Sequence, residues 1–302
     1  MRVNRSRRSS QSSSCAWKGR PERPPVRDNE SMPKLICVDV DGTLVTERQE
    51  TPDSAREAVR ASIAAGHKLL LCTGRSLPEI YPYLWDLGFH GIIAGSGAFV
   101  KIGKTVVADR RMSSEDISYV TAIYRRYGAQ WMWQGPEEFS VSEGFFGSFA
   151  GSPDAVGSPW HPYYKQILPF LTTDIPTSTS KGLFVLPHNL YLSYRELVEI
   201  IGPKYHIVSD SVEAKGGITG EILLAGLTKD VGMFAAAEHL GFDVKQTVAI
   251  GDSPNDVEIL DAAGIGVAMG NATDAVKAHA DFVTSSIEDD GLYRAFEALD
   301  LM

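Results

Sequence analysis

The sequence has few cysteines, and none of its apolar runs is long. Its 302 residues include three cysteines, at positions 15, 37 and 72. An odd count, with Cys37 and Cys72 inside apolar runs, argues against a disulfide framework and favours a reducing compartment such as the cytoplasm. The longest apolar runs, such as residues 67–72, are strand-sized and fall far short of the ~20 residues that a membrane helix needs. We therefore expect a cytoplasmic protein with no membrane span.

Positive charge is scarce outside the first segment. The formal net charge is −9, yet residues 1–31 carry eight Arg or Lys against three Asp or Glu. The remaining chain is therefore strongly acidic, which does not suggest a nucleic-acid partner. Such a protein can still bind phosphate groups if a metal ion and local dipoles supply positive charge.

Residues 1–31 lack any apolar periodicity. They are rich in Arg and Ser and then in Pro, so they cannot bury enough surface to order themselves. They also lack the apolar middle region of a secretory signal. We expect a disordered tail, or upstream sequence read as protein with Met32 as a sensible start; a transit peptide is the alternative.

From residue 33 onward, short apolar runs alternate with helical patterns. This alternation predicts a parallel sheet covered on both faces. Residues 110–217 differ, because they are rich in aromatic residues, Gly, Ser and Pro, and they predict an inserted α+β domain. The core would then comprise residues 32–109 and 218–302. Strands are expected at 34–38, 67–72, 91–94, 247–250 and 265–269, and helices at 52–65 (capped by Thr51), 76–87, 228–240, 254–263, 272–280 and 288–300.

Four polar clusters stand where predicted strands end or predicted helices begin. In open parallel sheets, ligands bind at the carboxyl ends of the strands. Each cluster also has an ordinary explanation by itself: an acid pair in a turn, a helix cap, a surface lysine, or capping of a helix by a serine. The clusters are Asp39-Val40-Asp41-Gly42-Thr43, Thr73-Gly74-Arg75, Lys229 and Gly251-Asp252-Ser253-Pro254-Asn255-Asp256.

In this order, the clusters resemble those of the haloacid-dehalogenase superfamily of phosphotransferases, from Met32 to the end of the chain. The last cluster, and the large insert after the second, are similar to Cof-like phosphatases with a type IIB cap. The resemblance implies a Rossmann-like parallel sheet core with an inserted α+β cap domain. It also implies a hydrolase of phosphoric monoesters. Dehalogenases of the family lack the second acid, so Asp41 argues against dehalogenation.

The resemblance also implies roles for the acidic residues. Asp39 would be the nucleophile, because a carboxylate can form an aspartyl-phosphate. Asp41 would be the general acid and base. Mg²⁺ would be bound by Asp39, by the backbone carbonyl of Asp41 and by Asp252, because hard oxygen ligands suit this ion. Asp256 would orient the ligands of the ion, or its bound waters, without binding the ion directly.

Phosphate oxygens would be held by the hydroxyl of Thr73, the amide of Gly74, Lys229 and Asn255. Lys229 begins a predicted helix, whose dipole would add positive potential. Arg75 has three possible roles: facing the phosphate, facing the cap, or forming a structural ion pair. Many relatives have Asn-Gly-Ala where this chain reads Ser-Gly-Ala from Ser96, which puts one substrate contact in doubt.

We therefore predict a Mg²⁺-dependent phosphatase of small phosphorylated metabolites that acts through an aspartyl-phosphate on Asp39. Among these metabolites, sugar phosphates are the favoured substrates. The alternatives are a phosphomutase of the same superfamily, decided by the cap, and a non-catalytic phosphate-binding regulatory protein, against which Asp39, Asp41, Asp252 and Lys229 argue. The cap would close over the site and exclude water. Its aromatic residues would either stack on a sugar or form the cap's own core. Neither the substrate nor the oligomeric state follows from the sequence.

Overall fold

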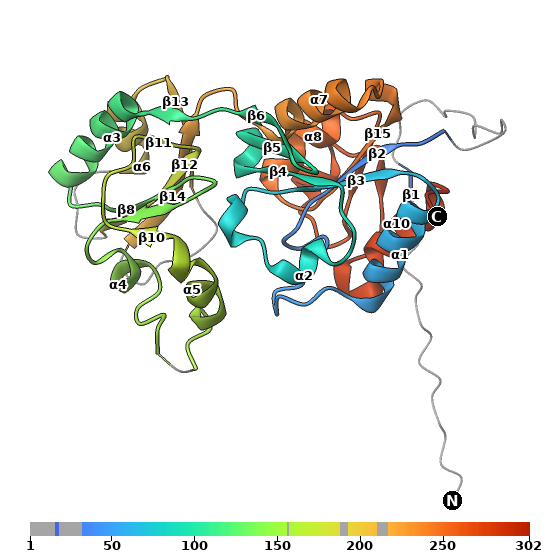
Figure 1. Cartoon of the computed structure of the whole chain (residues 1–302), viewed down its shortest axis with the longest axis horizontal. Helices are drawn as coiled ribbons and strands as arrows, with labels where there is room; N and C mark the ends of the chain where they lie inside the picture. The colour runs from blue at the N-terminus through green and yellow to red at the C-terminus, as the bar shows by residue number, and fades with distance from the viewer. Residues whose placement is uncertain (1–15, 18–31, 156, 188–192, 210–216) are drawn as a thin grey trace, which may run out of the picture.

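The computed structural model describes residues 16–17, 32–155, 157–187, 193–209 and 217–302. Within these ranges the strands form two large sheets that lie side by side in two lobes (Figure 1), and a third, two-stranded sheet. The larger sheet has the order β1-β17-β16-β15-β2-β3-β4-β5-β6, parallel from β17 to β4 and antiparallel at both ends. Its strands are β1 (Ala16–Trp17), β2 (Leu35–Val38), β3 (Lys68–Cys72), β4 (Gly91–Ala94), β5 (Phe99–Ile102), β6 (Thr105–Asp109), β15 (Thr247–Gly251), β16 (Ile265–Ala268) and β17 (Phe282–Val283).

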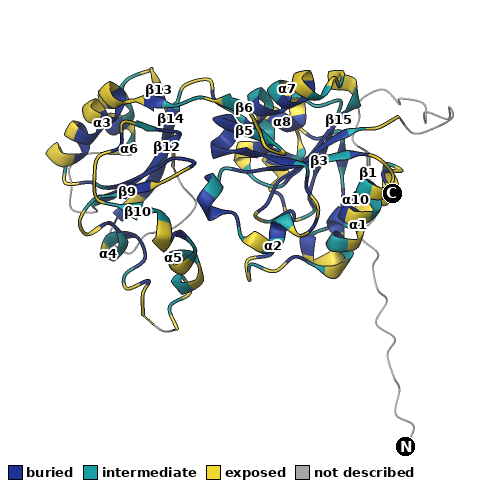
Figure 2. Cartoon of the chain, viewed as in Figure 1, coloured by how far each residue is buried: buried dark blue, intermediate teal, exposed yellow. Residues whose placement is uncertain are grey.

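Side chains alternate between the two faces of this sheet, and both faces are apolar. Ile36 and Val38 of β2 pack on one face, while Leu35 and Cys37 of the same strand pack on the other. Helices cover both faces and bury the strands (Figure 2), which confirms the predicted parallel α/β core. The first face is covered by α1 (Asp53–Ala64), α2 (Pro82–Trp85) and α10 (Gly291–Ala298), and the second by α7 (Lys229–Leu240), α8 (Val257–Ala262) and α9 (Asp274–Lys277).

Several predicted helices are shorter than expected. The single helix expected over residues 76–87 is wrong: a 3-10 turn at Leu77–Glu79 is separated from α2 by Ile80 and Tyr81, whose backbones are extended. The break falls there because the ring of Pro82 disfavours a helical residue before it. Thr51 does not cap α1, since Pro52 occupies the N-cap position and no side chain accepts a hydrogen bond there. In the same way, the helix expected over 254–263 starts with a 3-10 turn before α8, and the one over 272–280 contracts to α9.

The second sheet is the α+β insert. Its strand order is β10-β9-β8-β12-β14-β13, with α3 (Ser114–Arg126) and α6 (Tyr194–Ile201) on one face and α4 (Phe145–Phe149) and α5 (His161–Ile167) on the other. The strands are β8 (Gln130–Gln134), β9 (Phe139–Val141), β10 (Leu171–Thr172), β12 (Lys181–Pro187), β13 (Tyr205–Ser209) and β14 (Gly217–Leu224), and β7 (Met112–Ser113) pairs separately with β11 (Ser178–Thr179). Trp133, Phe139 and Phe145 are fully buried, so these aromatic residues form the core of the insert.

Two boundaries differ from the sequence prediction. β14 pairs antiparallel with β12 and β13, so residues 218–224 belong to the sheet of the insert and not to the resumed core. β14 continues as one strand to Leu224, and the chain turns only after it. Ala16 and Trp17, inside the expected disordered tail, pair with β17. The rest of residues 1–31 lies outside the described residues.

No helix among the described residues is long and apolar enough to cross a membrane. Cys37 and Cys72 are buried free thiols, and they lie in neighbouring strands of the core.

Candidate active site

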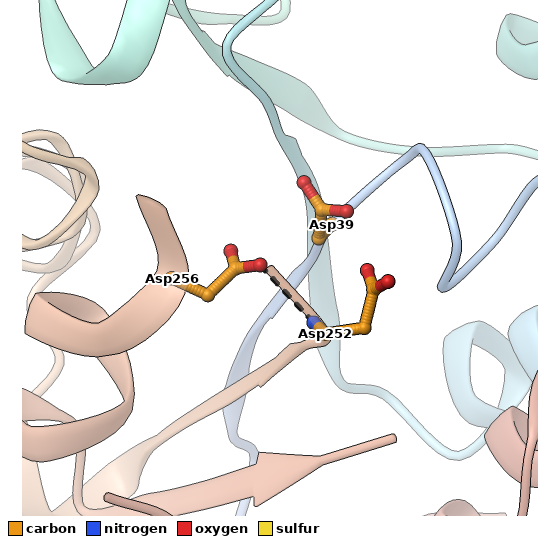
Figure 3. A group of neighbouring side chains, drawn as sticks. All are labelled: Asp39, Asp252 and Asp256. Carbon is orange, nitrogen blue, oxygen red and sulfur yellow. Dashed lines mark hydrogen bonds between the residues drawn. The ribbon is translucent and has the colours of Figure 1, made fainter. Parts of the chain in front are cut away.

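Three acidic side chains converge where β2 and β15 end (Figure 3). These strands are neighbours in the parallel sheet although more than 200 residues separate them in sequence. The amide of Asp39 continues their ladder by donating to the carbonyl of Ile250, 2.9 Å away. Asp39, Asp252 and Asp256 each have one carboxylate oxygen that lies within 4.8 Å of the corresponding oxygens of the other two.

Lys229 bridges two of these acids. It begins α7, and its side chain is fully buried. Its Nζ donates to Oδ1 of Asp39 at 2.7 Å and to Oδ1 of Asp256 at 2.6 Å. Burial would lower the pKa of Lys229, but the charges of Asp256 and Asp39 raise it well above its usual value. Lys229 is therefore a charged ammonium group beside the predicted nucleophile, and not a surface lysine.

Asp256 is almost fully engaged by protein groups. While its Oδ1 accepts from Lys229, its Oδ2 accepts from the amides of Asp252 and Ser253, at 3.1 and 3.0 Å, and from the hydroxyl of Ser253. Most of its lone pairs are therefore occupied. This arrangement suits a residue that fixes the loop after β15 and the lysine.

Asp252 is oriented by side chains from two separate segments of the chain. Its Oδ1 accepts from the hydroxyl of Thr43 at 3.1 Å, and its Oδ2 accepts from Nδ2 of Asn271 at 3.1 Å. The same Nδ2 donates to the carbonyl of Gly42 at 2.9 Å. Oδ1 of Asn271 in turn accepts from the amide of Ile287 at 3.0 Å, which fixes the orientation of the carboxamide.

The acids are electrostatically unfavourable together. The pKa of Asp39 is raised well above its usual value by burial and by the charge of Asp256, against the lowering effect of Lys229. Burial, again with the charge of Asp256, raises the pKa of Asp252 to about 6. One lysine therefore does not compensate three clustered carboxylates.

A divalent cation fits this group of residues. The available donors are carboxylate oxygens, which are the ligands that Mg²⁺ prefers. Oδ2 of Asp39 has no hydrogen-bond partner among the described residues, and the carboxylates of Asp39 and Asp252 are neighbours (Figure 3). A cation there would offset the mutual repulsion that raises the pKa of both acids.

Asp41 stands apart from the three acids, in an ion pair with Arg75. Nε of Arg75 donates to Oδ2 of Asp41 at 2.8 Å, and Nη2 donates to Oδ1 at 2.6 Å. Of the three roles considered for Arg75, the structure has the ion pair. Half of the Asp41 side chain remains exposed (49%), so its carboxylate is still accessible from solvent.

The remaining predicted phosphate ligands gather beside β3. Thr73 follows β3, and its Oγ1 accepts from the amide of Arg75 at 3.0 Å, which leaves the hydroxyl proton available to a ligand. A side chain on Gly74 would lie 3.4 Å from Nδ2 of Asn255 and 3.5 Å from Oγ of Ser96. Thr73, Gly74, Asn255 and Ser96 therefore border one small space, to which Ser96 contributes a hydroxyl.

Two residues of this arrangement were given no role from the sequence. Asn271 follows β16 just after a glycine, at the same carboxyl edge as the predicted clusters, and that position was the available signal. Thr43 was quoted within the first cluster, but its bond to Asp252 depends on the turn made at Gly42. Neither contact could be read from local sequence spacing.

Comparison with known proteins adds a family match. Residues 36–296 match the family model described as haloacid dehalogenase-like hydrolase. The 5-amino-6-(5-phospho-D-ribitylamino)uracil phosphatase YitU of Bacillus subtilis is 43% identical over 274 residues, which cover 88% of this chain and 97% of that protein. The phosphatase YcsE of the same organism, named for the same substrate, is 25% identical over 264 residues, covering 87% of this chain and 94% of that protein.

Solved structures share the fold. A protein of Geobacillus kaustophilus HTA426 superposes with a TM-score of 0.74 at 26% identity, covering 89% of this chain and all of that one. The subclass IIB sugar phosphatase BT4131 gives a TM-score of 0.71 at 24% identity, covering 89% of this chain and all of that one. This second similarity supports the two-lobed fold alone.

Proposed function

This chain belongs to the haloacid dehalogenase-like hydrolases, and we propose that it is a Mg²⁺-dependent phosphatase that acts through an aspartyl-phosphate on Asp39. One observation carries the proposal. A buried lysine donates to Asp39 at 2.7 Å, and the carboxylates of Asp252 and Asp256 lie beside the same aspartate. A carboxylate held in this way is oriented for attack on a phosphorus atom and has positive charge beside it.

In the first step, an oxygen of Asp39 forms a bond to phosphorus as the bond from phosphorus to the substrate oxygen breaks. Asp41, which has taken up a proton from solvent before this step, gives that proton to the departing oxygen. In the second step, water attacks phosphorus, Asp41 takes a proton from that water, and the bond to Asp39 breaks to release phosphate. Lys229 and the ligands near Thr73 hold the phosphoryl oxygens in both steps.

Mg²⁺ would be held by Asp39, by Asp252 and by the backbone carbonyl of Asp41, and when bound it neutralises charge on the phosphoryl oxygens. Asp256 and Asn271 would keep these ligands in place. Because Asp256 already accepts four hydrogen bonds, we assign it to the loop and to Lys229 and not to the ion.

The substrate class follows from the relatives. Both phosphatases named above act on a ribityl phosphate attached to a uracil, so a phosphorylated sugar or sugar alcohol on a small metabolite is the first class to test. That these relatives are named as phosphatases favours hydrolysis over a phosphomutase or a non-catalytic phosphate-binding protein.

The nucleophile can be tested directly. Asp39→Asn should abolish phosphate release, because an amide cannot form the acyl-phosphate. Asp53→Asn, which alters a fully exposed aspartate on α1, is the matched control and should keep full activity. Acid-quenched wild-type enzyme should carry a phosphoryl group on the Asp39 peptide by mass spectrometry. Near-normal phosphate release by Asp39→Asn would overturn the proposal.

A further inference from the structure

The ion pair between Asp41 and Arg75 is itself held in place by neighbouring groups. Besides its two bonds to Asp41, the guanidinium donates from Nη1 to the carbonyl of Glu79 at 3.1 Å and from Nη2 to Oε1 of Gln49 at 2.7 Å. It also stacks over the ring of Tyr81, 5.4 Å from its centroid. The position of Arg75, and with it the orientation of the Asp41 carboxylate, therefore depends on the backbone at Glu79.

Glu79 is a buried carboxylate that joins the two lobes. Its Oε2 accepts from the amide of Ser76 at 2.5 Å, which closes the 3-10 turn of the core. Its Oε1 accepts from two side chains of the insert, the hydroxyl of Tyr163 at 2.8 Å and Nε2 of Gln134 at 3.1 Å. Glu79 is only 6% exposed, so these bonds are shielded from water and are strong.

Residues 78 and 80 are held from the insert as well. Nε2 of Gln166 donates to the carbonyl of Pro78 at 3.1 Å and to that of Ile80 at 3.5 Å. Gln166 and Tyr163 both come from α5, which packs on the turn that contains Glu79. The position of α5 therefore determines the position of the 3-10 turn at Leu77–Glu79.

We propose that Glu79 is a positioning residue for Asp41: it transmits the placement of the insert, through Arg75, to the general acid. This inference rests on the proposed function. A general acid must lie within hydrogen-bond reach of the departing oxygen, and small displacements of catalytic groups are costly. The chain of contacts from Tyr163 through Glu79 and Arg75 to Asp41 supplies that placement without touching the nucleophile.

The test compares two leaving groups. An alkyl phosphate needs a proton on its departing oxygen, whereas p-nitrophenyl phosphate does not, because nitrophenolate is a stable anion. Tyr163→Phe removes only the hydroxyl that Glu79 accepts. It should lower kcat/KM for an alkyl phosphate about tenfold, as for one lost hydrogen bond to a charged group, and for the aryl phosphate less than about twofold. Tyr164→Phe, one residue further along α5 and in contact with Phe146, is the matched control and should change neither value.

A double-mutant cycle locates the effect. In a Glu79→Ala background, Tyr163→Phe should have no further effect on the alkyl-to-aryl ratio, because both changes break one pathway. An unchanged ratio in Tyr163→Phe, with wild-type enzyme active on both substrates, would overturn the role of Glu79. So would an equal fall on both substrates, or additive effects in the double variant. If wild-type enzyme hydrolyses neither substrate, or if Asp39→Asn stays active, the proposed function fails instead.

Discussion

At the scale of single residues, the site depends on a glycine, Gly42, whose lack of a side chain leaves room for the carboxylate of Asp252. Gly42 has a φ of +85°, and a side chain there would place its Cβ 2.2 Å from Oδ2 of Asp252. Glycine is therefore required at this position for two reasons: it adopts the left-handed backbone without strain, and it lets the carboxylate of Asp252 approach closely. The clash falls on the acid that we assign to the metal ion, so the effect on function should exceed the effect on stability.

Gly42→Ala should lower phosphatase activity by about 100-fold or more, because Asp252 must move. Gly66→Ala is the matched control: Gly66 has a φ of +94° but no atom within 4 Å of the added Cβ. Both variants should lose about 1–2 kcal/mol of stability from the left-handed backbone. Urea unfolding and phosphate release separate the two effects, and equal activity in both variants would contradict this account.

Asn271 is a second residue whose contribution should be measurable. Its carboxamide holds both Asp252 and the carbonyl of Gly42. Asn271→Ala should raise the Mg²⁺ concentration for half-maximal activity about 10- to 100-fold, the usual cost of losing an outer-sphere partner. Thr43→Val, which removes the other bond to Asp252, should act in the same direction. If neither variant changes the Mg²⁺ titration, Asp252 is not oriented for the ion by these two groups.

At the scale of elements, α3 shows how one buried acid fixes a helix to a strand. Asp116 completes a capping box with Ser113 and accepts from the hydroxyl of Tyr205 at 2.6 Å and from Lys204. Burial alone would raise the pKa of Asp116, but the bonds from Lys204, Tyr205 and Ser113 lower it well below its usual value. The stabilisation from this acid is therefore present above the unfolded pKa of about 4 and lost as pH falls further.

Asp116→Asn should cost about 2 kcal/mol of unfolding free energy at pH 7, because an amide cannot replace a charged acceptor. The difference from wild type should shrink progressively below about pH 4, where the acid becomes protonated in the unfolded chain. Urea titrations at pH 7, 5 and 3.5 measure this, with the exposed Asp53→Asn as control. A difference that is constant across this range would exclude a charge effect.

The elements also show what the sequence could and could not predict. The parallel strands and the order of the polar clusters were predictable, because apolar runs ending in acids or glycines are local signals. The break at Tyr81 could have been found from Pro82, by the rule for residues before proline. The pairing of β14 with the insert, and the bond from Asn271 to Asp252, join segments distant in sequence. No local pattern identifies such partners, so they required the three-dimensional structure.

At the scale of the whole molecule, the proposed metal site would link parts of the chain that are far apart. Asp39 and Asp252 belong to β2 and β15, and Asn271 follows β16. A cation bound by the first two would connect both segments of the core. Ligands that bind only the folded state raise its stability by mass action.

Mg²⁺ should therefore raise the melting temperature, with a gain of about 2.7 kcal/mol when the ion is at 100 times its dissociation constant. Asp252→Ala should abolish the rise, and Asp256→Ala should reduce it less, provided that the variant folds. Calorimetry with and without a chelator measures the effect. A rise that persists in Asp252→Ala would place the ion elsewhere.

The pairing of β2 with β15 has a consequence for synthesis. β2 is made early, but its partner on one side is complete only at residue 251. The insert, in contrast, is continuous in sequence, and its last strand ends at Leu224. Domains fold as units while the chain emerges from the ribosome, and distant pairings form slowly. On the ribosome, the insert can therefore fold first, whereas the sheet that contains β2 to β4 cannot be completed until the C-terminal strands have been made. No catalytic activity can therefore appear before the last quarter of translation begins.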